Sequence, residues 1–214
     1  MSTSPANAPG LFVAFEGGDG AGKSTQTRAL AEALLEAGHE VVLTREPGGT
    51  PAAEAIRHVV LTPEFAGLDA RAEALLYAAS RAEHVARLVR PALERGAVVI
   101  TDRYIDSSVA YQGVGRELAS DEIRQLSLWA AEGLLPDITV LLDLDVSIGR
   151  SRLDDARTRY DRLESEAADF HGRVRDAYLA LAAAEPERFL VLDATLPVDE
   201  LAALVRARVS AALA

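Results

Sequence analysis

The 214-residue sequence contains no cysteine, which excludes disulfide bonds, thiolate catalysis and cysteine-ligated zinc. It also has no apolar run approaching the roughly 18 residues of a membrane-spanning helix, so no membrane association is expected. Basic residues are in deficit: 22 Lys and Arg stand against 33 Asp and Glu, a formal net charge of −11. This deficit argues against a nucleic-acid polymer as partner, because such a partner requires a basic face. An anionic substrate must instead be attracted by local groups of arginines.

Lysine is almost absent, and the single one is Lys23. It lies in residues 17–24, GGDGAGKS, which fit the phosphate-binding pattern G-x-x-x-x-G-K-[ST]. An apolar run precedes this loop and a helical pattern follows it, as the motif requires. The pattern predicts that Lys23 contacts the β- and γ-phosphates of a nucleotide and that Ser24 ligates Mg²⁺. A guanine-specific GTPase would need an Asn-Lys-x-Asp motif, which a chain with this one lysine cannot contain.

Glycines in the loop allow backbone N–H groups to turn toward phosphate oxygens, and the following helix N-terminus adds partial positive charge. The residues expected to bind ATP are Gly17, Gly18, Asp19, Gly20, Ala21, Gly22, Lys23, Ser24 and Thr25.

The length suits a single domain, and 49% hydrophobic and 26% charged residues are ordinary for a globular protein. We expect residues 1–10, which are small and polar with two prolines, to form a flexible tail, and residues 11–214 to form the domain. The tail lacks the pattern of a signal peptide, so a cytoplasmic location is expected.

Apolar runs typical of strands alternate with helical patterns along the chain. Strands are predicted at 11–15, 40–44, 97–101, 138–142 and 188–192. Helices are predicted at 25–37, 52–61, 70–95 with a kink at Pro91, 120–132 with Ser120 and Asp121 as the cap, from 147 to at least 153, 164–184 and 198–213. This alternation indicates an α/β fold with a parallel sheet that is covered by helices on both faces.

Ligands of such a fold bind at the carboxyl ends of the strands, and polar residues gather there. Asp102 follows a strand and is suited to hold Mg²⁺, while Arg103 is suited to bind a second phosphate. The alternative is an Asp102–Arg103 salt bridge that caps the sheet. Residues 45–49, REPGG, are compatible with a simple turn as well as with a binding loop.

Two further patterns each allow two interpretations. Tyr77, Arg81 and His84 share one helix face. Tyr77 and Arg81 together can hold a planar base, although a core tyrosine beside an exposed arginine has the same spacing. His84 is assigned to the surface or to packing. Residues 150–162 mix charges of both signs, as in a solvated helix face or in a mobile lid that brings arginines onto ATP.

Together these residues resemble the thymidylate kinase family. The matching segments are residues 15–26, TREPGGT at 44–50, LYAASR at 76–81, DRY at 102–104, SS at 107–108, AYQG at 110–113 and DRLE at 161–164. The resemblance implies a P-loop kinase with five parallel strands in the order 2-3-1-4-5, a mobile lid at about 150–162, and a homodimer. It also implies transfer of the γ-phosphoryl group of ATP to dTMP with Mg²⁺. The nearest alternatives are a P-loop kinase of another nucleoside monophosphate or a small alcohol, and a non-catalytic ATP-binding module.

The resemblance also assigns roles to single residues. It implies that Asp19 and Arg103 engage the dTMP phosphate, Tyr77 stacks on thymine, Arg81 and Ser108 contact its polar edge, Pro47 lines the methyl pocket, Tyr111 lies under the deoxyribose, and Glu164 lies near metal and substrate. The family usually has phenylalanine at Tyr77. The catalytic set is Lys23, Arg103, Asp19 and a lid arginine. The loop has no arginine at Gly20 or Ala21, as in the bacterial subtype whose lid supplies it; Arg157 is favoured, with Arg152 and Arg159 as alternatives.

Overall fold

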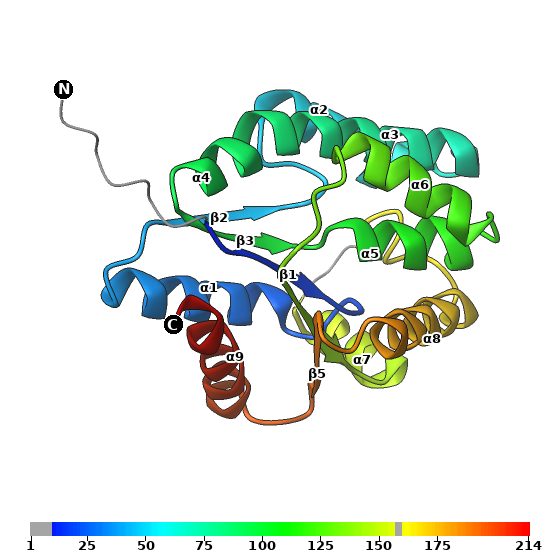
Figure 1. Ribbon diagram of the computed structural model, residues 1–214. Helices are drawn as coiled ribbons and strands as arrows, with labels where there is room; N and C mark the ends of the chain where they lie inside the picture. Colours follow the sequence, from blue (N-terminus) through cyan, green and yellow to red (C-terminus); the bar gives the residue numbers. More distant parts are fainter. Residues whose placement is uncertain (1–9, 157–159) are drawn as a thin grey trace, which may run out of the picture.

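The computed structural model describes residues 10–156 and 160–214; of the predicted tail, residues 1–9 lie outside the described residues. A five-stranded parallel sheet forms the centre of the fold (Figure 1). Its strands are β1 (Phe12–Glu16), β2 (Val41–Arg45), β3 (Val98–Asp102), β4 (Ile138–Asp143) and β5 (Phe189–Asp193), in the order β2-β3-β1-β4-β5. The predicted fold class and strand order are therefore confirmed.

Helices cover both faces of the sheet (Figure 1). The α-helices are α1 (Lys23–Glu36), α2 (Pro51–Leu61), α3 (Ala70–His84), α4 (Arg90–Glu94), α5 (Ile105–Ser108), α6 (Ser120–Ala130), α7 (Val146–Ala156), α8 (Ala168–Ala184) and α9 (Val198–Leu213). Shorter elements are a 3₁₀ turn, η1 (Pro63–Phe65), and two π-helical segments, η2 (Val85–Val89) and η3 (Val109–Gly115). None of the helices in the described ranges combines the length and apolarity that crossing a bilayer requires.

The alternation of side chains along β1 explains why both faces need cover. Val13 and Phe15 lie in a core cluster with residues of α1 and α9, whereas Phe12 and Ala14 lie in another with residues from η2 and α4. Successive strand residues point to opposite faces, so a strand that is apolar at every position must be buried on both. The polar residues that follow each strand then gather at one edge.

Three of the predicted helices differ from the structure in more than a shift of one or two residues at an end. The predicted helix 70–95 is divided into α3, η2 and α4, and the N–H of Arg90 bonds to the carbonyl of Val85 in a widened turn just before Pro91. Proline provides no N–H for the regular ladder, which accounts for the interruption. Helix α8 begins at Ala168 rather than 164, since the carboxylate of Asp161 accepts the N–H groups of Leu163 and Glu164 in a separate turn.

The third difference concerns α6. It begins at Ser120, but its N-cap residue is Ala119 and no side-chain cap forms there, so the predicted cap from Ser120 and Asp121 is wrong. Both residues are instead in the first turn of the helix, where the charge of Asp121 is favourable toward the helix dipole.

Candidate active site

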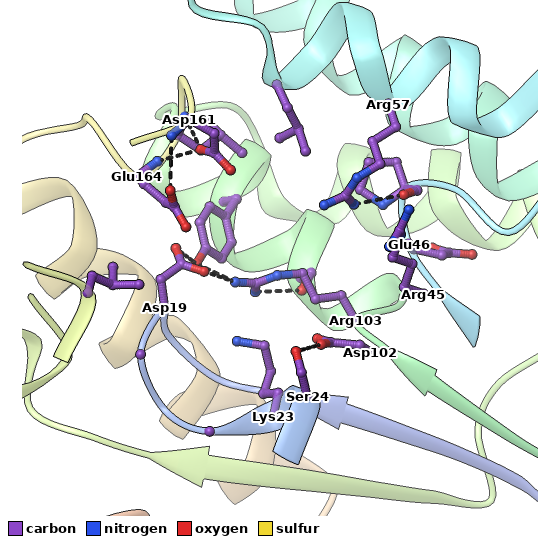
Figure 2. A pocket seen from close by; sticks show the side chains of 18 of the residues that line it. Asp19, Lys23, Ser24, Arg45, Glu46, Arg57, Asp102, Arg103, Asp161 and Glu164 are labelled. Atoms are coloured by element: carbon purple, nitrogen blue, oxygen red, sulfur yellow. Dashed lines mark hydrogen bonds and ion pairs between the residues drawn. The ribbon is translucent and has the colours of Figure 1, made fainter. Parts of the chain in front are cut away.

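A cavity of about 660 Å³ opens at the carboxyl edge of the sheet (Figure 2). The phosphate-binding loop, the ends of β2 and β3, helices α2 and α3, and the turn after residue 160 contribute to its wall. The predicted site residues that line it are Asp19, Gly20, Gly22, Lys23, Ser24, Thr25, Pro47, Tyr77, Asp102, Arg103, Tyr111 and Glu164. The structure therefore brings most of the predicted set to one cavity.

The phosphate-binding loop holds Lys23 against its own backbone. The Lys23 Nζ donates to the carbonyl oxygens of Gly17 at 3.0 Å and Gly18 at 2.8 Å. Burial and the nearby charge of Arg103 lower the pKa of Lys23, although neighbouring carboxylates oppose this. Gly20 has φ 77°, and a Cβ there would collide with the carbonyl of Gly149, so the loop requires glycine at this position.

Asp102 and Arg103 do not form the alternative salt bridge that caps the sheet. The hydroxyl of Ser24 donates to Asp102 Oδ2 at 2.9 Å, while Arg103 Nη2 donates to Asp19 Oδ1 at 2.5 Å (Figure 2). Arg103 also has φ 73°, which is uncommon for a residue with a side chain. Its backbone is held there by hydrogen bonds to Phe15 and Thr101.

The ion pair with Arg103 sets the charge of Asp19. Burial alone raises the pKa of a carboxyl group, but the charges of Arg103 and Lys23 outweigh burial and lower the pKa of Asp19. Tyr111 completes this group, since its hydroxyl accepts from Arg103 at 3.2 Å and donates to Asp19 at 3.3 Å. An arginine whose partners line a cavity is accessible to an incoming phosphate.

The far side of the cavity contains residues that the sequence reasoning missed. Arg57 of α2 donates to the carbonyl oxygen of Pro47 at 2.9 Å and lines the cavity with Arg45 and Gln112 (Figure 2). Burial and the charge of Arg45 lower the pKa of Arg57. The overall charge of −11 already required local arginines near an anionic substrate, and this signal could have pointed to Arg57.

Two predicted substrate contacts, Arg81 and Ser108, lie behind the cavity wall. Arg81 is only 1% exposed. Its guanidinium donates to Glu46 Oε2 at 2.8 Å, Ser127 Oγ at 3.0 Å and, through Nη2, to Ser108 Oγ and the carbonyl of Tyr104, both at 3.1 Å. Direct contact of Arg81 or Ser108 with a base therefore stays a prediction.

His84 belongs to the same buried group, where its Nδ1 lies 2.9 Å from Glu46 Oε1. It is fully buried, which agrees with a packing role and excludes a surface position. The sequence reasoning did not assign Glu46 any role. Its side chain joins α3 to the loop after β2, and the only signal for it was its place in the REPGG segment.

Comparison with known proteins decides the family. A family model described as thymidylate kinase matches residues 15–205. The chain belongs to the thymidylate kinase family. It is 64% identical over 204 residues to the thymidylate kinase of Leifsonia xyli subsp. xyli (95% of this chain, 96% of that one) and 66% identical over 199 residues to that of Clavibacter sepedonicus (93% and 94%). The crystal structure of thymidylate kinase from Ehrlichia chaffeensis matches with a TM-score of 0.77 at 34% identity, covering 95% of this chain and 99% of that one.

The predicted lid, residues 150–162, is described in part. Arg152 lines the cavity and donates to the carbonyl oxygens of Gly20 at 3.3 Å and Ala194 at 3.1 Å. The favoured Arg157, and Arg159, lie outside the described residues. Arg162, at the end of the predicted lid, is buried and bonds to Glu73 at 2.6 Å, so it fixes this end of the segment to α3.

A thymidylate kinase also implies Mg²⁺, and the donor atoms present fit such an ion. Ser24 and Asp102 offer two oxygen ligands at the cavity. Within the described ranges there is no group of three or more His, Cys, Asp or Glu residues that could hold a metal by itself. Mg²⁺ takes few protein ligands and completes its shell with phosphate oxygens and water, so the Ser24 and Asp102 oxygens are suited to it.

Proposed function

We propose that this chain transfers the γ-phosphoryl group of ATP to the phosphate of dTMP, giving dTDP and ADP. The observation that carries the proposal is the single cavity shared by the phosphate-binding loop, with Lys23 and Ser24, and the Asp19–Arg103 pair on its acceptor side. Membership of the thymidylate kinase family supports the choice of acceptor.

The acceptor atom is a phosphate oxygen, which is already anionic near neutral pH. The site therefore needs no general base, unlike a kinase that acts on a hydroxyl group. Its task is to hold two anionic groups together and to neutralise the charge that develops between them. We assign the ATP phosphates to Lys23 and the dTMP phosphate to Arg103. A lid arginine, for which we favour Arg157, would neutralise charge on the phosphoryl group that is transferred. Mg²⁺ held by Ser24 and Asp102 would neutralise phosphate charge.

The part of the cavity that we assign to the base is lined by side chains suited to it. Tyr77 is buried and lines the cavity, as a side chain that stacks on thymine must. Pro47 lies on the wall that we assign to the methyl group, and Tyr111 lies beside Arg103, where we place the deoxyribose. We assign Glu164, which accepts the N–H of Asp161 at 2.9 Å, to the region near metal and substrate.

We also propose a homodimer that forms through α3 and α6. These helices pack together, and each exposes a large apolar side chain: Leu75 is 59% and Trp129 is 80% exposed. A second subunit that packs against α3 and α6 would cover both side chains. Light scattering of the purified protein tests this: a dimeric mass that Leu75→Glu or Trp129→Glu converts to a monomeric mass supports the proposal, and a monomeric wild type contradicts it. The domain range 11–214 and a cytoplasmic location stay predictions.

The function is tested by a coupled assay of ADP release with dTMP, dUMP, UMP and AMP as acceptors, each with ATP and Mg²⁺. We expect the highest kcat/KM with dTMP. A higher value with another nucleotide would favour the alternative, a kinase of a different monophosphate on the same fold. ADP release that needs no acceptor would instead identify an ATP-hydrolysing binding module.

A further inference from the structure

A buried carboxylate shares two hydrogen-bond partners with Arg103. Glu16, the last residue of β1, is 0% exposed. Its Oε1 accepts the backbone N–H groups of Tyr104 at 2.8 Å and Ser107 at 3.2 Å. Its Oε2 accepts the hydroxyl of Ser107 at 2.6 Å and that of Tyr178 at 2.9 Å. The carboxylate therefore orders two hydroxyl groups from two different helices, α5 and α8.

The same two hydroxyl oxygens receive hydrogen bonds from Arg103. Its Nη1 lies 3.3 Å from Ser107 Oγ, 3.2 Å from the Tyr178 hydroxyl and 3.1 Å from the carbonyl oxygen of Gly17. The two hydroxyl oxygens also lie 2.7 Å apart, and each carries one proton, so at least one of them donates to Glu16 and keeps its lone pairs free to accept from the guanidinium. One nitrogen of Arg103 is thus fixed inside the protein, while Nη2 faces Asp19 and the cavity.

We propose that Glu16 is a positioning residue, which acts through Ser107 and Tyr178 to fix the Arg103 guanidinium in the orientation that binds the phosphate of the acceptor nucleotide. The inference rests on the proposed function, because it takes Arg103 as the arginine that receives the dTMP phosphate. It goes further because it gives Tyr178 a part in acceptor binding. Tyr178 lies on α8, more than 70 positions after Arg103 in the sequence.

The titration of Glu16 gives the proposal a second readout. Burial and the charge of Asp106 raise the pKa of Glu16 to about 7, although its hydrogen bond from Ser107 and the charge of Arg103 oppose this. The charged and titratable groups around it are Arg103 after β3, Asp106 of α5, which Arg188 pairs, Lys23 of α1 and Tyr178 of α8.

When Glu16 takes up a proton, it becomes a donor to one of the two hydroxyls and uses a lone pair that had faced Arg103. The raised pKa places this change near neutrality. Acceptor binding should therefore weaken as the pH falls through about 7. The acceptor phosphate itself titrates near 6, so the comparison must be made between variants at each pH.

The experiment is steady-state kinetics of the full chain, with KM for dTMP and for ATP measured from pH 6 to 9. The variants are Glu16→Gln and Tyr178→Phe, and the matched control is Tyr104→Phe. The control removes another buried tyrosine hydroxyl, which bonds to the carbonyl of Leu134 instead of to Arg103. We expect KM for dTMP to rise about tenfold in both test variants, as the loss of a hydrogen bond to a charged group implies. In both test variants, KM for ATP should stay close to wild type, and in the control Tyr104→Phe both KM values should do so. Glu16→Gln should also lose the rise in KM for dTMP that the wild type shows as the pH falls through about 7.

Each result decides between a positioning role and a structural one. Equal increases in both KM values, or an unchanged KM for dTMP in Tyr178→Phe, would overturn the inference. If Glu16→Gln fails to fold, Tyr178→Phe decides alone, since it keeps the carboxylate and the buried ring. A wild-type protein without dTMP kinase activity would instead contradict the proposed function, and the inference with it.

Discussion

Arg103 and Arg81 are both arginines that are largely removed from solvent, but they differ in how far they are exposed at the cavity. The Arg103 side chain is 17% exposed, and its partners Asp19 and Tyr111 line the cavity. Arg81 is 1% exposed; its partner Glu46 also lines the cavity, whereas its other partners, such as Ser127, do not. The resemblance to a family assigns both to the substrate, and the structure gives the two side chains different exposures.

The difference lies in what each arginine would leave behind on binding a ligand. Arg103 can exchange Asp19 for a phosphate at a surface that water reaches. Arg81 must stay paired with Glu46 when a ligand binds, because an unpaired carboxylate is costly in this buried position. We infer that Arg81, besides its predicted contact with the base, holds the loop after β2 against α3 and so keeps Pro47 and Tyr77 on the cavity wall.

The largest expected effect is on the cavity side, at Lys23. Lys23→Met should lower kcat by a factor on the order of 10³–10⁵, the value of a well-placed cation in phosphoryl transfer. The fold should be kept, because the Lys23 ammonium, as far as the described residues show, donates hydrogen bonds to the backbone carbonyls of Gly17 and Gly18, which belong to its own loop. Turnover and thermal unfolding would be measured together. A variant with near-normal kcat would contradict the role of Lys23.

On the buried side, Arg81→Ala should lower the free energy of unfolding by about 3–5 kcal/mol, because it leaves Glu46 buried without its arginine. Chemical denaturation measures this change. Arg103→Ala is the matched variant, and it should lose less stability but more acceptor binding. Equal losses of stability in the two variants would remove the distinction between the arginines.

The predicted lid contains two arginines, Arg152 and Arg157, that can be compared in the same way. Arg157→Ala should lower kcat by about a hundredfold or more, in line with other arginines that complete a phosphoryl-transfer site. Arg152→Ala is the control, since Arg152 already bonds to the loop carbonyl of Gly20. Single-turnover kinetics with saturating ATP and dTMP would compare them. If Arg152→Ala is the more damaging change, the assignment of the lid arginine is wrong.

The smallest effect is expected at Tyr77. Burial raises the pKa of the Tyr77 hydroxyl, so it is neutral at any pH of interest and the ring is what remains for stacking. Tyr77→Phe should leave kcat and KM for dTMP close to wild type. A large loss would show that the hydroxyl itself contacts the substrate.

The fold could be predicted in large part because its signals are local. Apolar runs gave five strands, and the motif at residues 17–24 placed the phosphate-binding loop between β1 and α1. The boundaries that failed depend on particular contacts, such as the turn closed by Asp161 ahead of α8. A mixed-charge run does not indicate which of its carboxylates will accept backbone N–H groups.

The site was predicted less completely, and for a different reason. The groups around Glu46 and Glu16 join residues that are 35 to 162 positions apart, so no local pattern reveals them. Arg57 and Gln112 face the cavity because of how α2 and η3 pack, which a single sequence does not encode in its spacing. Residue types and motifs identified the chemistry, while the partners that tune it required three-dimensional packing.

The exposed side chain on α6 has a practical consequence. Trp129 is the only tryptophan in the sequence. Excitation at the long-wavelength edge of the absorption band, where tyrosine absorbs little, therefore gives fluorescence from this one position. At 80% exposure its emission should resemble that of an indole in water. Covering that indole would shift the emission maximum toward shorter wavelengths. The emission maximum, measured while the protein is diluted, would therefore report on subunit association without any label or nucleotide.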